Sequence, residues 1–208
     1  MATTSRKHDI EHFDRWSLTY EKSWLQRHFF DRVHRAVLGL IAEEGEPKSI
    51  LDVGCGTGRL LRVARTRWAN VQLIGVDAAE GMVKVARQLA PDVTFHVGQA
   101  EALPLPDASV EVALSTTSFH HWSDQAAGVR EVARVLRPGG RFFLADISTS
   151  SWLSKLIHRS RFQSPAHVRT FFTEAGLQVL TQQTVVSRFV LVTVGVRPDK
   201  DYFIPSQT

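Results

Sequence analysis

Cysteine is almost absent from this sequence of 208 residues, and its single copy, Cys55, excludes an internal disulfide and a multi-cysteine metal site. A run of about 18 apolar residues, which a membrane-spanning helix needs, is also missing. The first residues contain no apolar stretch of the kind that forms a secretory signal. These absences predict a cytoplasmic protein without a transmembrane segment.

The composition is that of a globular protein, with 43% hydrophobic and 22% charged residues. Its length fits a single domain. The net charge of +4 comes entirely from the last 58 residues, where seven basic side chains stand against three acidic ones. A basic surface there would attract an anionic partner, whereas scattered charges on most proteins are only solvated.

Segments typical of helices and strands alternate along most of the chain. Apolar side chains recur at helical spacing over 8–44, and we expect 1–48 to form a helical lid on a main domain of 49–208, within one compact body. The predicted strands are 49–54, 71–76, 93–97, 110–114, 141–147, 177–185 and 189–194. The predicted helices of the main domain are 59–68, 80–89, 125–136, 152–158 and 165–175, with a turn at 137–140. This alternation predicts an α/β fold with a doubly wound, mostly parallel sheet, whose ligand binds beyond the carboxyl ends of the strands.

Three glycines, Gly54, Gly56 and Gly58, follow the first predicted strand. Glycine permits a sharp turn and lets a ligand approach where a Cβ would collide, and the N–H groups that begin the next helix favour an electron-rich group. Arg59 stands where a dinucleotide fingerprint needs glycine, and the GK[ST] ending of a phosphate loop is absent. Asp77, at the end of the next strand, is suited to accept hydrogen bonds from both hydroxyls of a ribose, and its alternative role is to cap a helix.

Four segments resemble those of the class I S-adenosylmethionine-dependent methyltransferases, particularly the ubiquinone and menaquinone biosynthesis methyltransferases. They are ILDVGCGTG, VDAAEGMVKVAR, VGQAEALPLPDASVEVAL and LRPGGRF, and they follow one another within 49–147 in the order found in that family. The resemblance implies a seven-stranded sheet in the order 3-2-1-4-5-7-6 with an antiparallel last strand. It also implies S-adenosylmethionine as the cofactor and S-adenosylhomocysteine as its product.

The same resemblance implies a role for each matching residue. The glycine loop with Asp52 would hold the methionine portion of the cofactor, Asp77 the ribose, and residues of the next segments the adenine. Gln99 stands where the family commonly has aspartate, which implies an altered adenine contact. Cys55 is expected to pack against its neighbours and not to act as a nucleophile. The residues implied to contact the cofactor are Tyr20, Asp52, Gly54, Cys55, Gly56, Gly58, Asp77, Ala78, Met82, Gln99, Ala100, Glu101 and Ser115.

Polar side chains after the fourth and fifth predicted strands are candidates for a base that takes a proton from the methyl acceptor. They are His120, His121 and Asp146. We predict that His121 is the base, because histidine acts near neutral pH without perturbation. His120 is expected to face away, because adjacent residues in an extended stretch point to opposite sides. The absence of a third ligand at suitable spacing predicts that the two histidines bind no metal.

Two absences after the fourth strand favour a small-molecule acceptor. The segment STTS lacks the Asn/Asp-Pro-Pro-aromatic motif of methyltransferases that act on base amines, and it lacks the cysteine nucleophile of cytosine C5 methylation. Aromatic residues in the lid and after residue 148 suit a planar or lipophilic acceptor such as a quinol or phenol. Three alternatives stay open: an RNA or protein methyltransferase, a non-catalytic S-adenosylmethionine-binding subunit, and an NAD(P)-dependent oxidoreductase. Arg59 and the lack of a Tyr-x-x-x-Lys pair disfavour the last of these.

Overall fold

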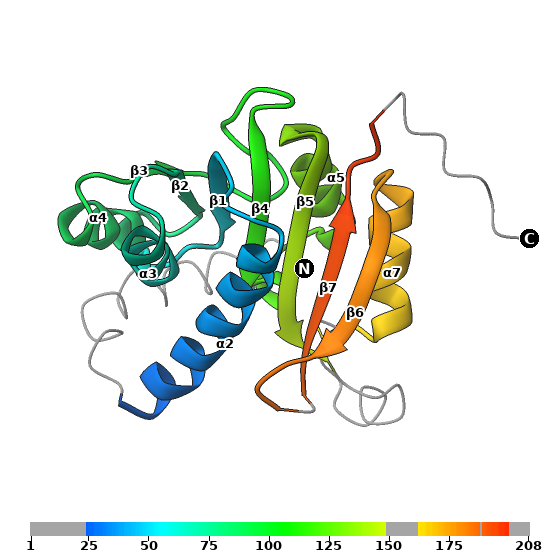
Figure 1. The fold of residues 1–208 in the computed structure, drawn as a ribbon, viewed down its shortest axis with the longest axis horizontal. Helices are drawn as coiled ribbons and strands as arrows, with labels where there is room; N and C mark the ends of the chain where they lie inside the picture. Colours follow the sequence, from blue (N-terminus) through cyan, green and yellow to red (C-terminus); the bar gives the residue numbers. More distant parts are fainter. Residues whose placement is uncertain (1–23, 149–161, 188, 200–208) are drawn as a thin grey trace, which may run out of the picture.

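A seven-stranded sheet in the order β3-β2-β1-β4-β5-β7-β6 forms the centre of the computed structural model, which describes residues 24–148, 162–187 and 189–199 (Figure 1). The strands are β1 (Ser49–Val53), β2 (Gln72–Asp77), β3 (Thr94–Val97), β4 (Val110–Thr116), β5 (Leu136–Ile147), β6 (Gln178–Thr184) and β7 (Val190–Val196). Neighbouring strands are parallel except where β7 pairs with β5 and β6. The predicted doubly wound sheet, its strand order and its antiparallel last strand are confirmed.

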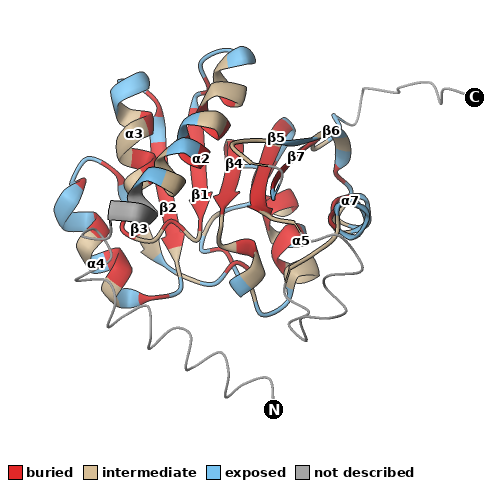
Figure 2. Cartoon of the chain, turned by 90° about the horizontal axis from the view of Figure 1, so that it is seen from below, coloured by how far each residue is buried: buried red, intermediate tan, exposed pale blue. Residues whose placement is uncertain are grey.

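Helices cover both faces of this sheet. The helices are α2 (Trp24–Glu43), α3 (Arg59–Arg67), α4 (Glu80–Leu89), α5 (Gln125–Val135) and α7 (Pro165–Glu174), with a short 3-10 helix η1 (Phe119–His121). Figure 2 shows α2 and α3 on one side of the sheet and α5 on the other, with mostly buried strands between them. One hydrophobic cluster joins α2, α3 and α4 to the sheet, and a second joins α5 and α7 to it. Strand β1 is buried along its whole length, so its sequence shows no alternation of apolar and polar residues.

The helices on the second face begin at capping residues. The carboxylate of Asp124 accepts a hydrogen bond from the N–H of Ala127 at 2.9 Å, at the start of α5. Ser164 accepts one from the N–H of His167 at 3.3 Å, at the start of α7. These caps satisfy N–H groups that have no partner inside the helix. The cap of α5 also marks the end of the loop that follows β4, where several candidate site residues lie.

Strand β5 begins at Leu136 and not at residue 141, so the turn predicted at 137–140 is wrong. These residues form a bulge within the strand, at the point where its register with β4 shifts. Gly139, with a φ of 76°, donates its N–H to the carbonyl of Arg197 at 2.8 Å. The neighbouring chain therefore keeps the glycine-rich segment attached to the sheet.

Some predictions concern residues outside the described ranges. They are Tyr20, the first part of the expected lid (1–23) and the helix expected at 152–158. The remainder of the expected lid forms α2, whose apolar side chains join the core beneath α3. No helix in the described part of the chain is long and apolar enough to cross a membrane.

Candidate active site

The loop after β1 turns on three glycines with positive φ: Gly54 (79°), Gly56 (52°) and Gly58 (72°). Packing requires two of them, because a Cβ on Gly54 would collide with the hydroxyl of Ser118, and a Cβ on Gly58 would lie 2.6 Å from Cζ of Phe95. A Cβ on Gly56 would meet no protein atom within 4 Å. Gly56 therefore faces open space that a ligand is able to fill.

A cleft opens beside Gly56, between α2 and the carboxyl ends of β1 and β4. Two buried atoms in it, Oδ1 of Asp52 and Nδ1 of His34, have no hydrogen-bond partner in the described part of the chain. Burial raises the pKa of Asp52 to about 8, with a further contribution from the charge of Asp77, and burial lowers the pKa of His34 to about 4. Near neutral pH the cleft thus presents a protonated carboxyl and a neutral imidazole, each with one buried atom that lacks the usual hydrogen-bond partner among the residues that the structure describes. The lining residues are Phe30, His34, Asp52, Gly54, Cys55, Gly56, Thr57, Arg59, Leu60, Thr116 and Thr117.

An ion pair ties α2 to the loop side of this cleft. Arg59, the first residue of α3, donates to both carboxylate oxygens of Asp31 on α2, at 2.7 and 2.8 Å. Burial alone would raise the pKa of Asp31, but the hydrogen bonds and the positive charge of Arg59 outweigh it and hold that pKa below its ordinary value. The two-pronged contact fixes the position of α2 over the glycine loop.

Asp77, the last residue of β2, is hydrogen-bonded to two backbone groups. Its Oδ2 accepts from the N–H of Gly56 at 2.8 Å, and its Oδ1 accepts from the N–H of Ala79 at 2.9 Å. The first contact holds the glycine loop, and the second is a local contact two residues along the chain; the N-cap position of α4 is Ala79, so Asp77 is not the helix cap that the alternative prediction offered. A carboxylate has about four acceptor positions, so a single carboxylate is able to accept from backbone N–H groups and from a ribose hydroxyl.

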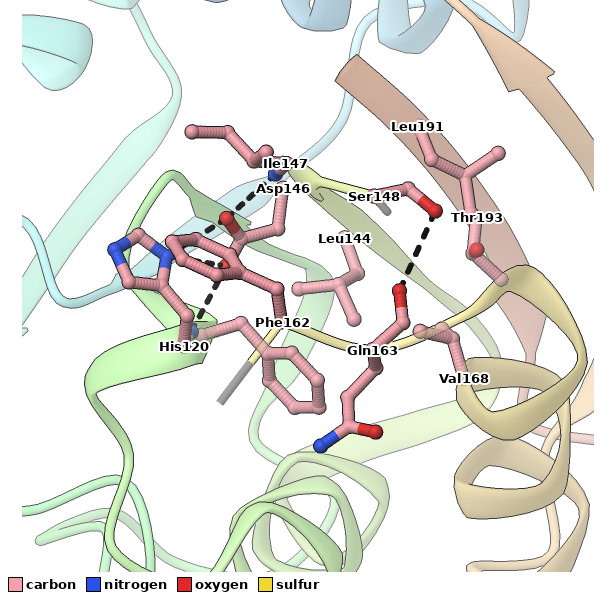
Figure 3. Close-up of a pocket in the computed structure, with 11 residues that line it drawn as sticks. His120, Leu144, Asp146, Ile147, Ser148, Phe162, Gln163, Val168, Leu191 and Thr193 are labelled. Atoms are coloured by element: carbon pink, nitrogen blue, oxygen red, sulfur yellow. Dashed lines mark hydrogen bonds and ion pairs between the residues drawn. The ribbon is translucent and has the colours of Figure 1, made fainter. Parts of the chain in front are cut away.

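A second pocket lies after the carboxyl ends of β4 and β5, and its polar lining residues include His120 and Asp146 (Figure 3). The prediction that His120 and His121 face opposite ways is wrong. Both belong to η1, and their ring centroids are only 4.0 Å apart. Consecutive side chains on a 3-10 helix diverge by about 120°, not by the half-turn of an extended chain. His120 is half-buried and His121 is exposed.

Residues 51–144, which include the glycine loop, Asp77 and β4, match the family profile described as a methyltransferase domain. This part of the chain is a methyltransferase domain. Among curated proteins, the O-methyltransferase resE of Aspergillus sclerotiorum is 32% identical over 158 residues, which cover 72% of this chain and 59% of that protein. The demethylmenaquinone methyltransferase of Deinococcus radiodurans is 33% identical over 138 residues, which cover 64% of this chain and 57% of that protein. The chain therefore spans less than three fifths of the length of these two relatives.

Solved structures share the architecture of this methyltransferase domain. One is from the complex between the Trm112 methyltransferase activator of Haloferax volcanii and a methyltransferase. It has a TM-score of 0.73 and 25% sequence identity, and the match covers 89% of this chain and 97% of that chain. The fold is thus the Rossmann-like fold of class I methyltransferases, as the resemblance implied.

The residues predicted near the adenine occupy different settings in the methyltransferase domain. Ala78 is exposed, directly after the end of β2, and Met82 is buried in α4. Gln99 is exposed and forms an isolated backbone bridge with Ala102, while Ala100 is buried. Contacts of these residues with the cofactor stay predictions.

Glu101 links two elements of the domain. Its Oε1 accepts hydrogen bonds from the N–H groups of Ser123 at 2.6 Å and Asp124 at 2.9 Å. The carboxylate thereby connects the segment after β3 to the start of α5. Its predicted contact with the adenine edge stays a prediction beside this structural role.

Ser115 and Cys55 are both buried. Ser115 is fully enclosed, with its Oγ 3.0 Å from Oγ of Ser118, and its neighbours Thr116 and Thr117 line the cleft in its place. Thr117 has a φ of 52°, which is unusual for a β-branched residue and turns the chain away at the end of β4. Burial, with the nearby charges of Asp77 and Asp52, raises the pKa of Cys55 well above its ordinary value. The thiol therefore stays protonated, as expected of a packing residue.

Several lining residues of the cleft are absent from the sequence-based prediction, and His34 is the most informative of them. The sequence does contain a signal, because His34 lies one turn from Phe30 and next to Val33 on the apolar stripe of α2. The rings of Phe30 and His34 are stacked with centroids 6.4 Å apart. That this stripe reaches the glycine loop depends on the packing of α2 against α3. In the ranges described, no group of three or more His, Cys, Asp or Glu side chains is arranged to hold a metal ion.

Proposed function

We propose that this chain transfers a methyl group from S-adenosylmethionine to a small-molecule acceptor. The observation that carries the proposal is the cleft over Gly56, in which Oδ1 of Asp52 and Nδ1 of His34 are buried with no hydrogen-bond partner among the described residues. An amino-acid head group offers an ammonium to one of these atoms and a carboxylate to the other. S-adenosylmethionine has such a head group and supplies a methyl group that its sulfonium has already activated.

Residues of the cleft and of the neighbouring strand β2 and helix α4 would each hold one part of the cofactor. Asp52 would hold the ammonium, His34 the carboxylate and Asp77 the hydroxyls of the ribose. Strands β1 and β2 are parallel neighbours, so Asp52 and Asp77 lie near adjacent carboxyl ends. Ala78 and Met82 would contact the adenine beyond the ribose. The protein then contributes to the reaction by orienting the two reactants and by excluding water.

The acceptor is proposed to be a small aromatic or lipophilic molecule of the quinol or phenol type. The second pocket supports this class, because its wall around His120 includes Phe119, Leu144 and Phe162. The names of the relatives point the same way, since one is an O-methyltransferase and the other acts on demethylmenaquinone. A cytoplasmic location belongs to the same proposal.

An assay of methyl transfer separates this function from its competitors. The formation of S-adenosylhomocysteine is measured with phenols, quinols, tRNA and peptides as acceptors. The same measurements are repeated with a Trm112-type protein added, because the Haloferax relative is seen with such a partner. Turnover of phenols or quinols is expected. Turnover confined to tRNA or peptides would favour the competing function, and cofactor binding without any turnover would favour a non-catalytic subunit.

His34→Ala is expected to weaken the binding of S-adenosylhomocysteine about 10- to 100-fold. The variant loses a hydrogen bond to a charged group, which contributes about 1.5–3 kcal/mol. 5′-Methylthioadenosine lacks the amino-acid group, so its affinity should be the same for wild-type protein and variant. Isothermal titration calorimetry measures both ligands. A variant that binds S-adenosylhomocysteine as tightly as wild-type protein would remove His34 from the cofactor site.

Asp77→Ala is expected to weaken the binding of S-adenosylhomocysteine and of 5′-methylthioadenosine about 10- to 100-fold, because both ligands contain the ribose. Part of this loss comes from the glycine loop, since Asp77 also accepts from the N–H of Gly56. Asp77→Asn keeps one acceptor oxygen and should show a smaller loss. Calorimetry on both variants, with thermal melting to confirm the fold, makes the comparison. Unchanged affinities in a folded Asp77→Ala protein would show that the ribose binds elsewhere.

A further inference from the structure

The second pocket contains a histidine held in one orientation by a buried carboxylate. Nδ1 of His120 lies 2.8 Å from Oδ1 of Asp146 and 3.1 Å from its Oδ2 (Figure 3). The carboxylate itself is fixed by two backbone groups, because the N–H of His120 donates to Oδ2 at 2.9 Å and the N–H of Ile147 donates to Oδ1 at 2.6 Å. Asp146 is only 8% exposed. The position of the imidazole is therefore set by one carboxylate at the end of β5, which backbone groups of η1 and β5 hold in place.

This arrangement selects one tautomer of the imidazole. An ionised carboxylate only accepts hydrogen bonds, so Nδ1 of His120 is the protonated nitrogen and Nε2 carries the lone pair. Among the described residues, Nε2 of His120 has no hydrogen-bond partner. A carboxylate in this place also stabilises the imidazolium that forms when Nε2 accepts a proton. His120 is thus positioned to accept a proton at Nε2.

The surroundings of the pair fit a flat apolar molecule with one polar group. The ring of Phe162 lies 4.6 Å from that of His120, at an interplanar angle of 32°. Most of the other lining residues are apolar, among them Phe119, Leu144 and Leu191, and Ser148, Gln163 and Thr193 are polar. The cavity measures only about 10 Å³, so a planar acceptor would have to push these side chains apart; its ring would then meet apolar walls and its polar group would meet His120.

The pair is also close to the proposed cofactor cleft along the chain and across the sheet. Thr117 lines that cleft, and its N–H donates to the carbonyl of Ala145 at 2.8 Å. Asp146 directly follows Ala145, and His120, at the centre of η1, lies shortly after Thr117 in the sequence. The two pockets thus adjoin the end of β4, where the chain runs from Thr117 at the cleft to His120 at the second pocket.

We propose that the second pocket binds a phenol-type acceptor and that His120, positioned by Asp146, takes the proton of its hydroxyl. The inference rests on the function proposed above. As the acceptor oxygen forms its bond to the methyl carbon, the bond from that carbon to sulfur breaks and its electron pair stays on sulfur. The hydroxyl proton moves to Nε2 of His120 and later leaves to water. His120 is then the catalytic residue and Asp146 a positioning residue.

The test measures the methylation of two phenols of different acidity by wild-type protein and by the variant His120→Asn. Asparagine is able to keep the hydrogen bond to Asp146 but has no basic nitrogen. We expect turnover of 4-methylphenol to fall about 100- to 10,000-fold, the usual contribution of a general base. Turnover of 4-nitrophenol, whose hydroxyl ionises readily in mildly alkaline solution, should fall less than about 10-fold. His167→Asn, an exposed histidine on α7, is the matched control and should leave both rates unchanged.

Nitrogen-15 NMR of the imidazoles gives a second measurement that needs no turnover. His120 should be protonated on Nδ1 in wild-type protein with S-adenosylhomocysteine bound. Asp146→Asn should lose this preference, because the amide replaces one acceptor oxygen by a donor. A wild-type His120 protonated on Nε2 alone would contradict the proposal.

The remaining outcomes also decide the matter. Equal losses with both phenols in His120→Asn would show a structural role and overturn the proposal. An acidity-dependent loss in His121→Asn, and none in His120→Asn, would assign the base to His121. Wild-type protein that binds S-adenosylhomocysteine but methylates no phenol would overturn the acceptor class while leaving the cofactor site in place. Failure to bind S-adenosylhomocysteine at all would instead contradict the proposed function.

Discussion

Gly56→Val is expected to abolish measurable binding of S-adenosylhomocysteine, with a loss of affinity of at least about 100-fold. The branched side chain would occupy the open space above the loop, where a Cβ now meets no protein atom within 4 Å. Gly56 also has a φ of 52°, and a non-glycine residue held in such a region costs about 1–3 kcal/mol of stability. Calorimetry reports the binding, and thermal melting reports the stability.

A matched variant separates the two effects of this substitution. Gly176 has a φ of 79°, and its Cβ would likewise meet nothing within 4 Å, but it follows α7 and does not line the cleft. Gly176→Val should therefore lower the melting temperature by a similar amount while binding S-adenosylhomocysteine like wild-type protein. Near-normal affinity in a folded Gly56→Val variant would show that the loop after β1 does not hold the cofactor.

The affinity for S-adenosylhomocysteine is expected to depend on pH through the buried carboxyl of Asp52. Its pKa of about 8 in the cofactor-free protein means that the carboxyl is mostly protonated near neutral pH, whereas an ammonium needs the ionised form. The affinity for S-adenosylhomocysteine should thus fall about tenfold for each pH unit below about 8. Binding near pH 7 should release a proton, which is visible as a dependence of the calorimetric enthalpy on the buffer.

Asp52→Asn should remove this pH dependence and weaken binding on the order of 100- to 1,000-fold, because the ammonium loses its buried counterion. Titrations of wild-type protein and variant in buffers of different ionisation enthalpy make the comparison. A wild-type enthalpy that is independent of the buffer, or a variant with wild-type affinity, would argue against an ammonium beside Asp52.

The same substitution should change stability in the opposite direction. The pKa of Asp52 is raised on folding, so its contribution to stability is complete below the ordinary carboxyl pKa and is lost as the pH rises through about 8. Cofactor-free Asp52→Asn should therefore melt at least a few degrees above wild-type protein near pH 8 and close to it near pH 4, a gain of about 1 kcal/mol or more. Melting curves at the two pH values test this. A variant less stable than wild-type protein near pH 8 would contradict the burial of a charge at this site.

The strands and the position of the glycine loop could be predicted from the sequence because they depend on local patterns, whereas the strand order was implied by the family resemblance. Strand β1 is a short, mostly apolar run that stops at Gly54, and Asp77 ends the next such run. The separate roles of the three glycines could not be predicted in this way. Ser118 and Phe95, from distant segments, decide that Gly54 and Gly58 serve packing and that Gly56 faces the cleft.

The residues at the acceptor side needed the structure for a different reason. The segment from Ser118 to Trp122 contains no glycine or proline that would indicate a 3-10 helix. An extended chain is therefore the simpler prediction for His120 and His121. The partner of His120 comes from β5, and only the pairing of β4 with β5 brings Asp146 to it. His34 likewise depends on the packing of α2, which the Arg59–Asp31 ion pair fixes.

Calorimetric titration of the wild-type protein with S-adenosylhomocysteine, and separately with NADH, tests the central claim most directly. The cleft over Gly56, with Asp52 and His34 on its walls and Asp77 at the end of the next strand, predicts saturable binding of S-adenosylhomocysteine at one site per chain. It predicts no binding of NADH, because Arg59 replaces the glycine that a dinucleotide loop needs. Binding of NADH with no heat from S-adenosylhomocysteine would contradict the account.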